Sequence, residues 1–221
     1  KPFSILLEPF GRNTAPAIAL AAMKALESQL NPILLILSSD HEIKNTEIFI
    51  KTINEAFKFA ENGRLVTFGI MPTSPHTGYG YIKASSSLNP KKIEGYDIEE
   101  FTEKPDLETA QRFLKTKRYT WNSGMFMFEA KTIIDEITKY QPEIINICQH
   151  ALLNSKYDLD FQRLNKVEFK KCPNLSIDIA VMEKTDKGTV LPLNAGWNDI
   201  GSWEAIWETS NKDKNGNFRK G

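Results

Sequence analysis

Short apolar runs alternate along the chain with longer segments in which apolar residues recur every three or four positions. The short runs occupy residues 3–7, 33–37, 65–70, 81–84, 98–102, 125–128 and 190–193. Runs of four to seven residues rich in Ile, Leu, Val and Phe are typical of strands buried in a sheet. The alternation therefore predicts an α/β fold in which helices cover a central sheet.

The helical segments begin at recognisable capping residues. Thr14 is the predicted N-cap of the first helix, Asn45 of the second and Asp106 of the third. Two further helices are predicted near residues 131–140 and 142–153, the second with Pro142 in its first turn. The inner face of the second helix is predicted to consist of Phe49, Ile53, Phe57 and Ala60.

Composition narrows the class of protein. The 221 residues include 28 basic and 28 acidic side chains, so the net charge is zero and a nucleic-acid-binding role is not expected. The longest apolar run, residues 32–37, is too short to span a bilayer. Cys148 and Cys172 show no metal-ligand spacing, which favours a reducing cytoplasm. We expect one soluble domain over residues 1–210 and a polar tail or linker over 211–221.

Two aspartates follow predicted strands and are candidate metal ligands. Asp40 follows the run 33–37, and Asp199 lies in a Trp-Asn-Asp-Ile-Gly-Ser-Trp segment after the run 190–193. Ligands of open α/β sheets bind beyond the carboxyl ends of strands, and carboxylates there suit Mg²⁺ that carries a polyphosphate. The alternative is that each aspartate caps a helix, for Asp199 one starting near Ser202. For Asp40 alone, capping is the commoner outcome.

Three further segments carry polar groups at strand ends or turns. Glu103 and Lys104 follow the end of a predicted strand and precede a proline. Glu103 could bind sugar hydroxyls and Lys104 a phosphate, or the two could form only an exposed ion pair. Arg12 and Asn13 lie in a strand-to-helix turn, where they could read a base edge or belong to a plain turn. Gly80 closes a Gly-Tyr-Gly sequence that is not specific alone.

In their order and spacing these motifs resemble the bacterial mannose-1-phosphate guanylyltransferases, including forms fused to a mannose-6-phosphate isomerase. Seven segments carry the resemblance between residues 6 and 203. They are Glu-Pro-Phe-Gly-Arg-Asn-Thr-Ala-Pro-Ala from residue 8, Ser-Asp-His from 39, Gly-Tyr-Gly-Tyr-Ile from 78, Phe-Thr-Glu-Lys-Pro from 101, Trp-Asn-Ser-Gly-Met-Phe from 121, Ser-Ile-Asp-Ile-Ala-Val-Met-Glu-Lys from 176 and Trp-Asn-Asp-Ile-Gly-Ser-Trp from 197.

The resemblance implies a Rossmann-like nucleotide-diphospho-sugar transferase fold, with a mixed, mostly parallel sheet and helices on both faces. It implies that GTP and mannose 1-phosphate react to give GDP-mannose and pyrophosphate, and it admits a homodimer. It also implies roles for ten residues. Asp40 and Asp199 would bind Mg²⁺ and, with Lys104, take part in catalysis, whereas Arg12, Asn13 and Thr14 would bind guanine. Gly80, Glu103, Asn122 and Asp178 would lie on the sugar side of the site, where the role of Asp178 is unassigned.

The sequence departs from this family at the front. The glycine-rich motif Gly-Gly-x-Gly-x-Arg-Leu-Trp-Pro-x-Ser-Arg, which grips the triphosphate, is absent from these residues. We expect residue 1 to be a truncation or processing boundary, and these 221 residues alone to be nearly inactive. Two alternatives stay open: another sugar-1-phosphate nucleotidyltransferase, such as a glucose-1-phosphate thymidylyltransferase, and a non-catalytic sugar-nucleotide-binding module. The presence of both Asp40 and Asp199 argues against the second.

Overall fold

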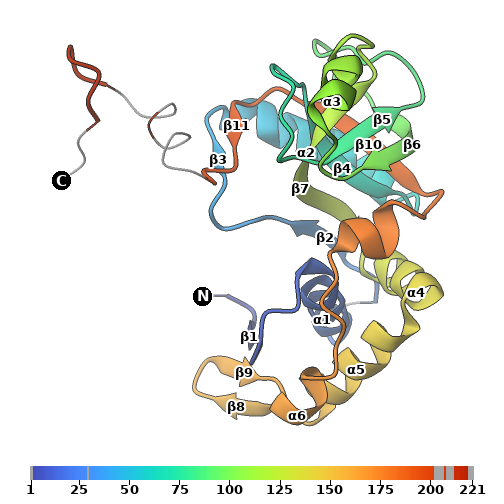
Figure 1. Cartoon of the computed structure of the whole chain (residues 1–221). Helices are drawn as coiled ribbons and strands as arrows, with labels where there is room; N and C mark the ends of the chain where they lie inside the picture. Colours follow the sequence, from blue (N-terminus) through green and yellow to red (C-terminus); the bar gives the residue numbers. More distant parts are fainter. Residues whose placement is uncertain (1, 29, 202–206, 208–211, 219–221) are drawn as a thin grey trace.

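A computed structural model describes residues 2–28, 30–201, 207 and 212–218 (Figure 1). The helix predicted near Ser202 and parts of the predicted tail, residues 211 and 219–221, lie outside the described residues. None of the helices within the described ranges is both long and apolar enough to cross a membrane.

The main sheet has six strands in the order β2-β7-β4-β10-β6-β5, and β7 also pairs with β5. Its strands are β2 (Ile33–Ile36), β4 (Leu65–Ile70), β5 (Tyr81–Ala84), β6 (Tyr96–Thr102), β7 (Tyr119–Glu129) and β10 (Gly188–Leu193). Helix α2 (Thr46–Ala60) covers one face, and α1 (Thr14–Leu26) with α4 (Ala130–Tyr140) packs against the other. The predicted mixed α/β architecture with helices on both faces is confirmed.

The expectation of a mostly parallel sheet needs correction at the level of neighbouring strands. Strands β2, β4, β5 and β10 point the same way, but only the β4–β10 pair is parallel in this sheet. Strand β7 lies antiparallel between β2 and β4, and β6 lies antiparallel between β10 and β5. Apolar patterning reports how deeply a strand is buried and not its direction, so the sequence could not distinguish these pairings.

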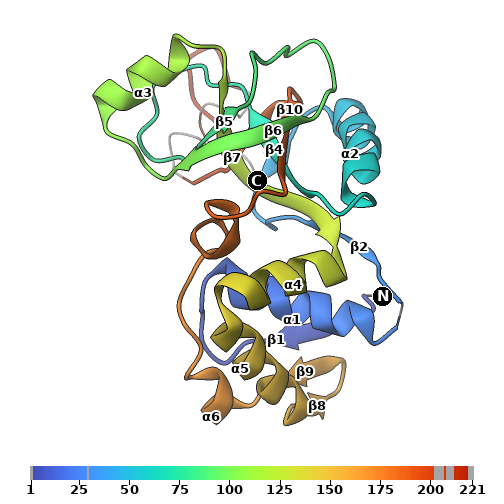
Figure 2. The same cartoon turned by 90° about the vertical axis from the view of Figure 1, so that its right-hand side faces the viewer.

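A second lobe lies below the main sheet in the views of Figures 1 and 2. It contains α5 (Pro142–Leu153), α6 (Lys166–Phe169) and a small sheet in the order β1-β9-β8. The strands of this sheet are β1 (Ile5–Leu7), β8 (Lys156–Asp158) and β9 (Phe161–Arg163). The first predicted strand therefore exists, but it pairs in parallel with β9 and takes no part in the main sheet.

Most of the predicted caps are observed. Asn45 Oδ1 accepts from Ile48 N at 3.0 Å, Asp106 Oδ1 accepts from Thr109 N at 2.8 Å before α3 (Leu107–Leu114), and Pro142 opens α5. The prediction that Thr14 is the N-cap of α1 is wrong, because Thr14 is the first residue of the helix. Asn13 is the cap, with a φ of 64° and Oδ1 accepting from Thr14 N. The Thr14 hydroxyl instead accepts from Ile177 N at 2.8 Å.

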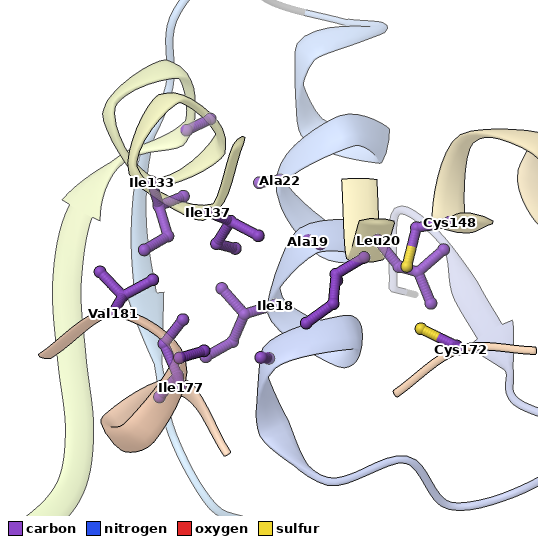
Figure 3. Close-up of a cluster of buried hydrophobic side chains, with 14 of the residues drawn as sticks. Ile18, Ala19, Leu20, Ala22, Ile133, Ile137, Cys148, Cys172, Ile177 and Val181 are labelled. Carbon is purple, nitrogen blue, oxygen red and sulfur yellow. The ribbon is translucent and has the colours of Figure 1, made fainter. Parts of the chain in front are cut away.

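Strand β7 separates two hydrophobic cores, because its successive side chains point to opposite faces. Phe126 and Phe128 join the core built with α1, α4 and α5, whereas Met125 and Met127 join the core under α2. Figure 3 shows part of the first core, where Ile18 of α1 faces Ile133 of α4 and Val181 of η1 (Asp178–Met182). The same core contains Ile144 and Cys148 of α5, so it joins the second lobe to the sheet.

The predicted inner face of α2 is partly wrong. Ala60 is buried as expected and Phe49 and Ile53 are partly buried, but Phe57 is 47% exposed. Thr52 and Ala56 are fully buried instead. Thr52, Ala56 and Ala60 recur every four residues and so share the buried face of the helix, which leaves Phe57 on the neighbouring face toward solvent.

Candidate functional site

A two-stranded ladder joins the segments that carry Asp40 and Asp199. Strand β3 (Glu42–Ile43) pairs antiparallel with β11 (Trp197–Asn198), with Trp197 opposite Ile43. Continuing this register by one position places Asp199 opposite His41, next to Asp40. Trp197 Nε1 donates to His41 Nδ1 at 3.2 Å, and the two rings meet edge to face at 5.2 Å. The two candidate carboxylates therefore lie on neighbouring segments, although 159 positions separate them in the chain.

The two carboxylates differ in their surroundings. Asp199 Oδ1 accepts from the Tyr79 hydroxyl at 3.0 Å and from Gly201 N at 3.4 Å. The Asp40 side chain is 80% exposed, and its Oδ1 lies 4.0 Å from His41 Nε2. Asp199 is thus held in place by the protein, whereas Asp40 is presented to solvent.

A cavity of about 240 Å³ opens beside this ladder. Six of the ten predicted site residues line it: Thr14, Gly80, Glu103, Asn122, Asp178 and Asp199. Arg12, Asn13, Asp40 and Lys104 do not line it. His41, Tyr79 and Trp197 do, and the sequence reasoning did not assign them to the site. Their presence in the same matching segments as Asp40, Gly80 and Asp199 was the signal that could have found them.

Hydrogen bonds connect the predicted sugar-side residues. Asn122 of β7 donates from Nδ2 to Asp178 Oδ1 at 2.9 Å, and its backbone N–H donates to Gly80 O at 2.8 Å. A Cβ atom on Gly80 would lie 2.7 Å from Glu103 Oε2, so only glycine lets this carboxylate approach the loop so closely. The arrangement brings two carboxylates and an amide to one wall of the cavity.

Asp178 is the perturbed titratable group of this wall. Burial raises its pKa to about 6, and the nearby carboxylates of Glu103 and Glu183 add to the rise, while the hydrogen bond from Asn122 opposes it. A buried carboxyl kept beside other carboxylates in a cavity is typical of functional sites.

The Asp178→Asn variant is expected to be more stable than the wild type at neutral pH. Because the folded-state pKa is above the ordinary value of 3.8, the folded protein loses stability as pH rises between about 4 and 6. A shift of this size corresponds to on the order of 2–3 kcal/mol at pH 7. Asparagine keeps an acceptor for Asn122 but carries no charge.

Urea unfolding of both proteins at pH 4.5 and pH 7.5 measures this effect. The difference in free energy of unfolding between variant and wild type should grow with pH. A difference that is equal at the two pH values would show that Asp178 does not titrate in this range.

Arg12 and Lys104 lie outside the cavity for identifiable reasons. Arg12 Nη2 donates to the carbonyl oxygen of Lys170, in the second lobe, and its Nε is buried. Lys104 has a φ of 46° and a side chain 66% exposed, with Nζ 3.7 Å from Glu103 Oε1. Lys104 can therefore reach the cavity mouth only by reorienting, and Arg12 helps to attach the turn before α1 to the second lobe.

The donor set suits a hard cation. Within the described ranges no group of three or more His, Cys, Asp or Glu side chains is arranged to hold a metal ion. Mg²⁺ does not need such a group, because it usually takes one or two carboxylates together with substrate phosphates and water. Asp40 and Asp199 provide carboxylate oxygens on adjoining segments, so the residues present fit this mode of binding.

The fold agrees with the comparison with known families. The chain belongs to the nucleotidyl transferase family, whose model matches residues 2–216. It is 53% identical over 220 residues to the mannose-1-phosphate guanylyltransferase of Salmonella montevideo and 50% identical over 221 residues to the xanthan biosynthesis protein XanB of Xanthomonas campestris pv. campestris (strain B100). These alignments cover 98% and 100% of this chain but 46% of each relative. The chain thus spans about half the length of these curated relatives.

Solved structures resemble the chain as well. A Thermus thermophilus protein described as mannose-1-phosphate geranyltransferase has a TM-score of 0.77 at 31% identity, covering 91% of this chain and 56% of that one. A Helicobacter pylori protein described as mannose-6-phosphate isomerase has a TM-score of 0.77 at 35% identity, covering 88% and 73%. A UDP-glucose pyrophosphorylase bound to UDP-glucose, at 14% identity and a TM-score of 0.52 over 90% of this chain and 61% of that one, shares the fold.

Proposed function

We propose that this chain is the nucleotidyl-transfer domain of a mannose-1-phosphate guanylyltransferase, which makes GDP-mannose and pyrophosphate from GTP and mannose 1-phosphate. The observation that carries the proposal is the cavity itself. It gathers Thr14, Gly80, Glu103, Asn122, Asp178 and Asp199, which come from six of the seven sequence segments that resemble this family. The similarity to relatives of that name supports the choice of substrates.

In this proposal different residues of the cavity bind the sugar, the phosphates and the base. Glu103, Asn122 and Asp178 bind hydroxyl groups of the sugar, because carboxylates accept and amides both accept and donate hydrogen bonds. Thr14 opens α1 beside the cavity. The N–H groups of Thr14 and Ala15 are already paired with Asn13 Oδ1 and Leu175 O, and Pro16 has none, so it is the positive end of the helix dipole that would favour phosphate there. Arg12 and Asn13 lie outside the cavity, so their proposed part in guanine binding requires the nucleotide to extend past Thr14.

Asp40 and Asp199 would hold Mg²⁺, which when bound neutralises the charge of the phosphates. Lys104, once reoriented toward the cavity mouth, would add a positive charge beside the sugar phosphate. A phosphate oxygen of mannose 1-phosphate forms the new bond to the α-phosphorus of GTP, and the bond to pyrophosphate breaks. That oxygen is already anionic at neutral pH, so the protein needs to position the two substrates in line and no general base is required.

A pyrophosphate-release assay tests this function. The experiment uses this chain with the family's glycine-rich motif added at its amino end, and compares GTP and mannose 1-phosphate with dTTP and glucose 1-phosphate. Turnover that favours the first pair supports the proposal, and preference for the second pair identifies a thymidylyltransferase. A thermal shift with GDP-mannose and Mg²⁺ but no turnover would identify a non-catalytic binding module.

The Glu103→Ala variant is expected to raise KM for mannose 1-phosphate by about 10-fold or more while KM for GTP changes little. The reason is that a site built to bind hydroxyl groups loses on the order of 1.5–3 kcal/mol when a charged hydrogen-bond partner is removed. Glu108→Ala, in the exposed first turn of α3, is the matched control. Equal losses for both substrates would indicate a damaged fold or a different role for Glu103.

The location and assembly of the protein belong to the same proposal. Cys148 and Cys172 are free thiols, which fits a cytoplasmic protein. In the described part of the chain β2 pairs only with β7, so its other edge offers backbone groups that a second copy could cover in a homodimer. Light scattering of the purified protein measures that assembly.

A further inference from the structure

Tyr79 lies at the centre of an aromatic cluster beside the cavity. Its ring stacks on His76 with a centroid distance of 4.1 Å and an interplanar angle of 17°. Trp121 and Trp197 contact it from other sides, with centroids at 5.2 and 5.8 Å. Three aromatic neighbours leave the Tyr79 ring little freedom to rotate.

The hydroxyl of this fixed ring is directed at one oxygen of Asp199. It donates to Oδ1 at 3.0 Å, and Gly201 N donates to the same oxygen at 3.4 Å. Oδ1 is the acceptor of both hydrogen bonds that the described part of the chain makes to this carboxylate. The carboxylate is therefore restrained against rotation, and Oδ2 is left for other ligands.

We propose that Tyr79 is a positioning residue for the metal site. Its hydroxyl, held in place by the packed ring, orients Asp199 so that Oδ2 faces a divalent cation. This inference rests on the proposed function, in which Asp199 is a metal ligand. Hydrogen-bond partners of metal-ligating carboxylates fix the geometry of the ligand, and their loss typically reduces metal affinity or activity by about 10- to 100-fold.

The same loop connects the metal side of the cavity to its sugar side. Gly80, which follows Tyr79, accepts a backbone hydrogen bond from Asn122 at 2.8 Å, and Asn122 is bonded to Asp178. A displacement of this loop would move Tyr79 and Gly80 together. Tyr79 thus couples the orientation of Asp199 to the residues proposed to bind the sugar.

The test is the Tyr79→Phe variant, which removes the hydroxyl and keeps the ring. Binding of Mn²⁺ in the presence of GDP-mannose is measured by electron paramagnetic resonance on the amino-terminally extended protein. We expect the Kd for Mn²⁺ to rise about 10- to 100-fold, and the apparent KM for Mg²⁺ to rise with it. The kcat at saturating Mg²⁺ should change much less, because the cation restores the geometry once bound.

The matched control is Tyr96→Phe, which removes a hydroxyl that bonds Asn89 N and Glu94 far from Asp199. It should bind Mn²⁺ as the wild type does. Circular dichroism and melting curves of each variant separate a lost hydroxyl from a lost fold. Mn²⁺ binding by a folded Tyr79→Phe protein that matches the wild type would overturn the inference.

The Asp199→Asn variant separates the proposed metal role of Asp199 from the proposed positioning role of Tyr79. If it loses Mn²⁺ affinity while Tyr79→Phe does not, Asp199 is a ligand that needs no positioning, and only the role of Tyr79 fails. If Asp199→Asn keeps full Mn²⁺ affinity, the metal role of Asp199 fails, and the role of Tyr79 fails with it.

Discussion

The Asp199→Asn variant is expected to turn over GTP and mannose 1-phosphate about 10²–10³-fold more slowly than the wild type. Removal of one preorganised charge-stabilising group from a phosphoryl-transfer site typically costs this much in kcat. Asparagine still accepts hydrogen bonds from Tyr79 and Gly201, so the loop should keep its conformation. What is lost is the negative charge that attracts the cation.

Steady-state kinetics on the amino-terminally extended protein measure this loss over a range of Mg²⁺ concentrations. Asp158→Asn is the matched control, since Asp158 forms an exposed ion pair with Arg163 in the second lobe. Its kcat should stay close to that of the wild type. Wild-type kcat in the Asp199→Asn protein at every Mg²⁺ concentration would exclude Asp199 from catalysis.

The Phe128→Ala variant is expected to lower the free energy of unfolding by about 3–5 kcal/mol. Phe128 is fully buried on β7, opposite Leu34 of β2, and it packs in the core shared by α1, α4 and α5. Truncation leaves a cavity in a core that joins the two lobes, and a core bounded by three helices and a sheet cannot easily collapse to fill it.

Urea unfolding followed by circular dichroism measures this difference. Phe57→Ala is the matched control, because the same truncation on the exposed face of α2 removes little packing and introduces a better helix former. It should change the free energy of unfolding by less than about 1 kcal/mol. Equal losses in both variants would show that the burial of Phe128 contributes no more to stability than the exposed ring of Phe57.

Several site residues could be assigned before the structure because their signals are local in sequence. Glu103, Asn122 and Asp178 each belong to a short segment that resembles the same family, and the structure brings them to one cavity. Tyr79 and His41 lie in equally specific segments, but their importance depends on partners 120 and 156 positions away, Asp199 and Trp197. No local pattern records such a contact.

For Arg12 and Asp40 the sequence did not predict the direction of the side chain. A guanidinium in a strand-to-helix turn and a carboxylate after a strand were both expected to face the ligand. Arg12 donates to Lys170 in the second lobe, and the Asp40 side chain is 80% exposed. Neither residue lines the cavity, and their parts in nucleotide and metal binding stay predictions. The direction of a side chain at a turn depends on what packs against it, and such neighbours come from distant parts of the chain.

The sequence by itself determined the class of fold, the positions of most helices and strands, and the family. Helix caps and apolar periodicity act within a few residues, and seven ordered motifs are specific as a set. Only the tertiary structure decided the strand directions, the placement of β1 in a second sheet, and the ring cluster that holds Asp199. These features depend on hydrogen bonds and packing between segments that lie far apart in the chain, and their energies exist only after the chain has folded.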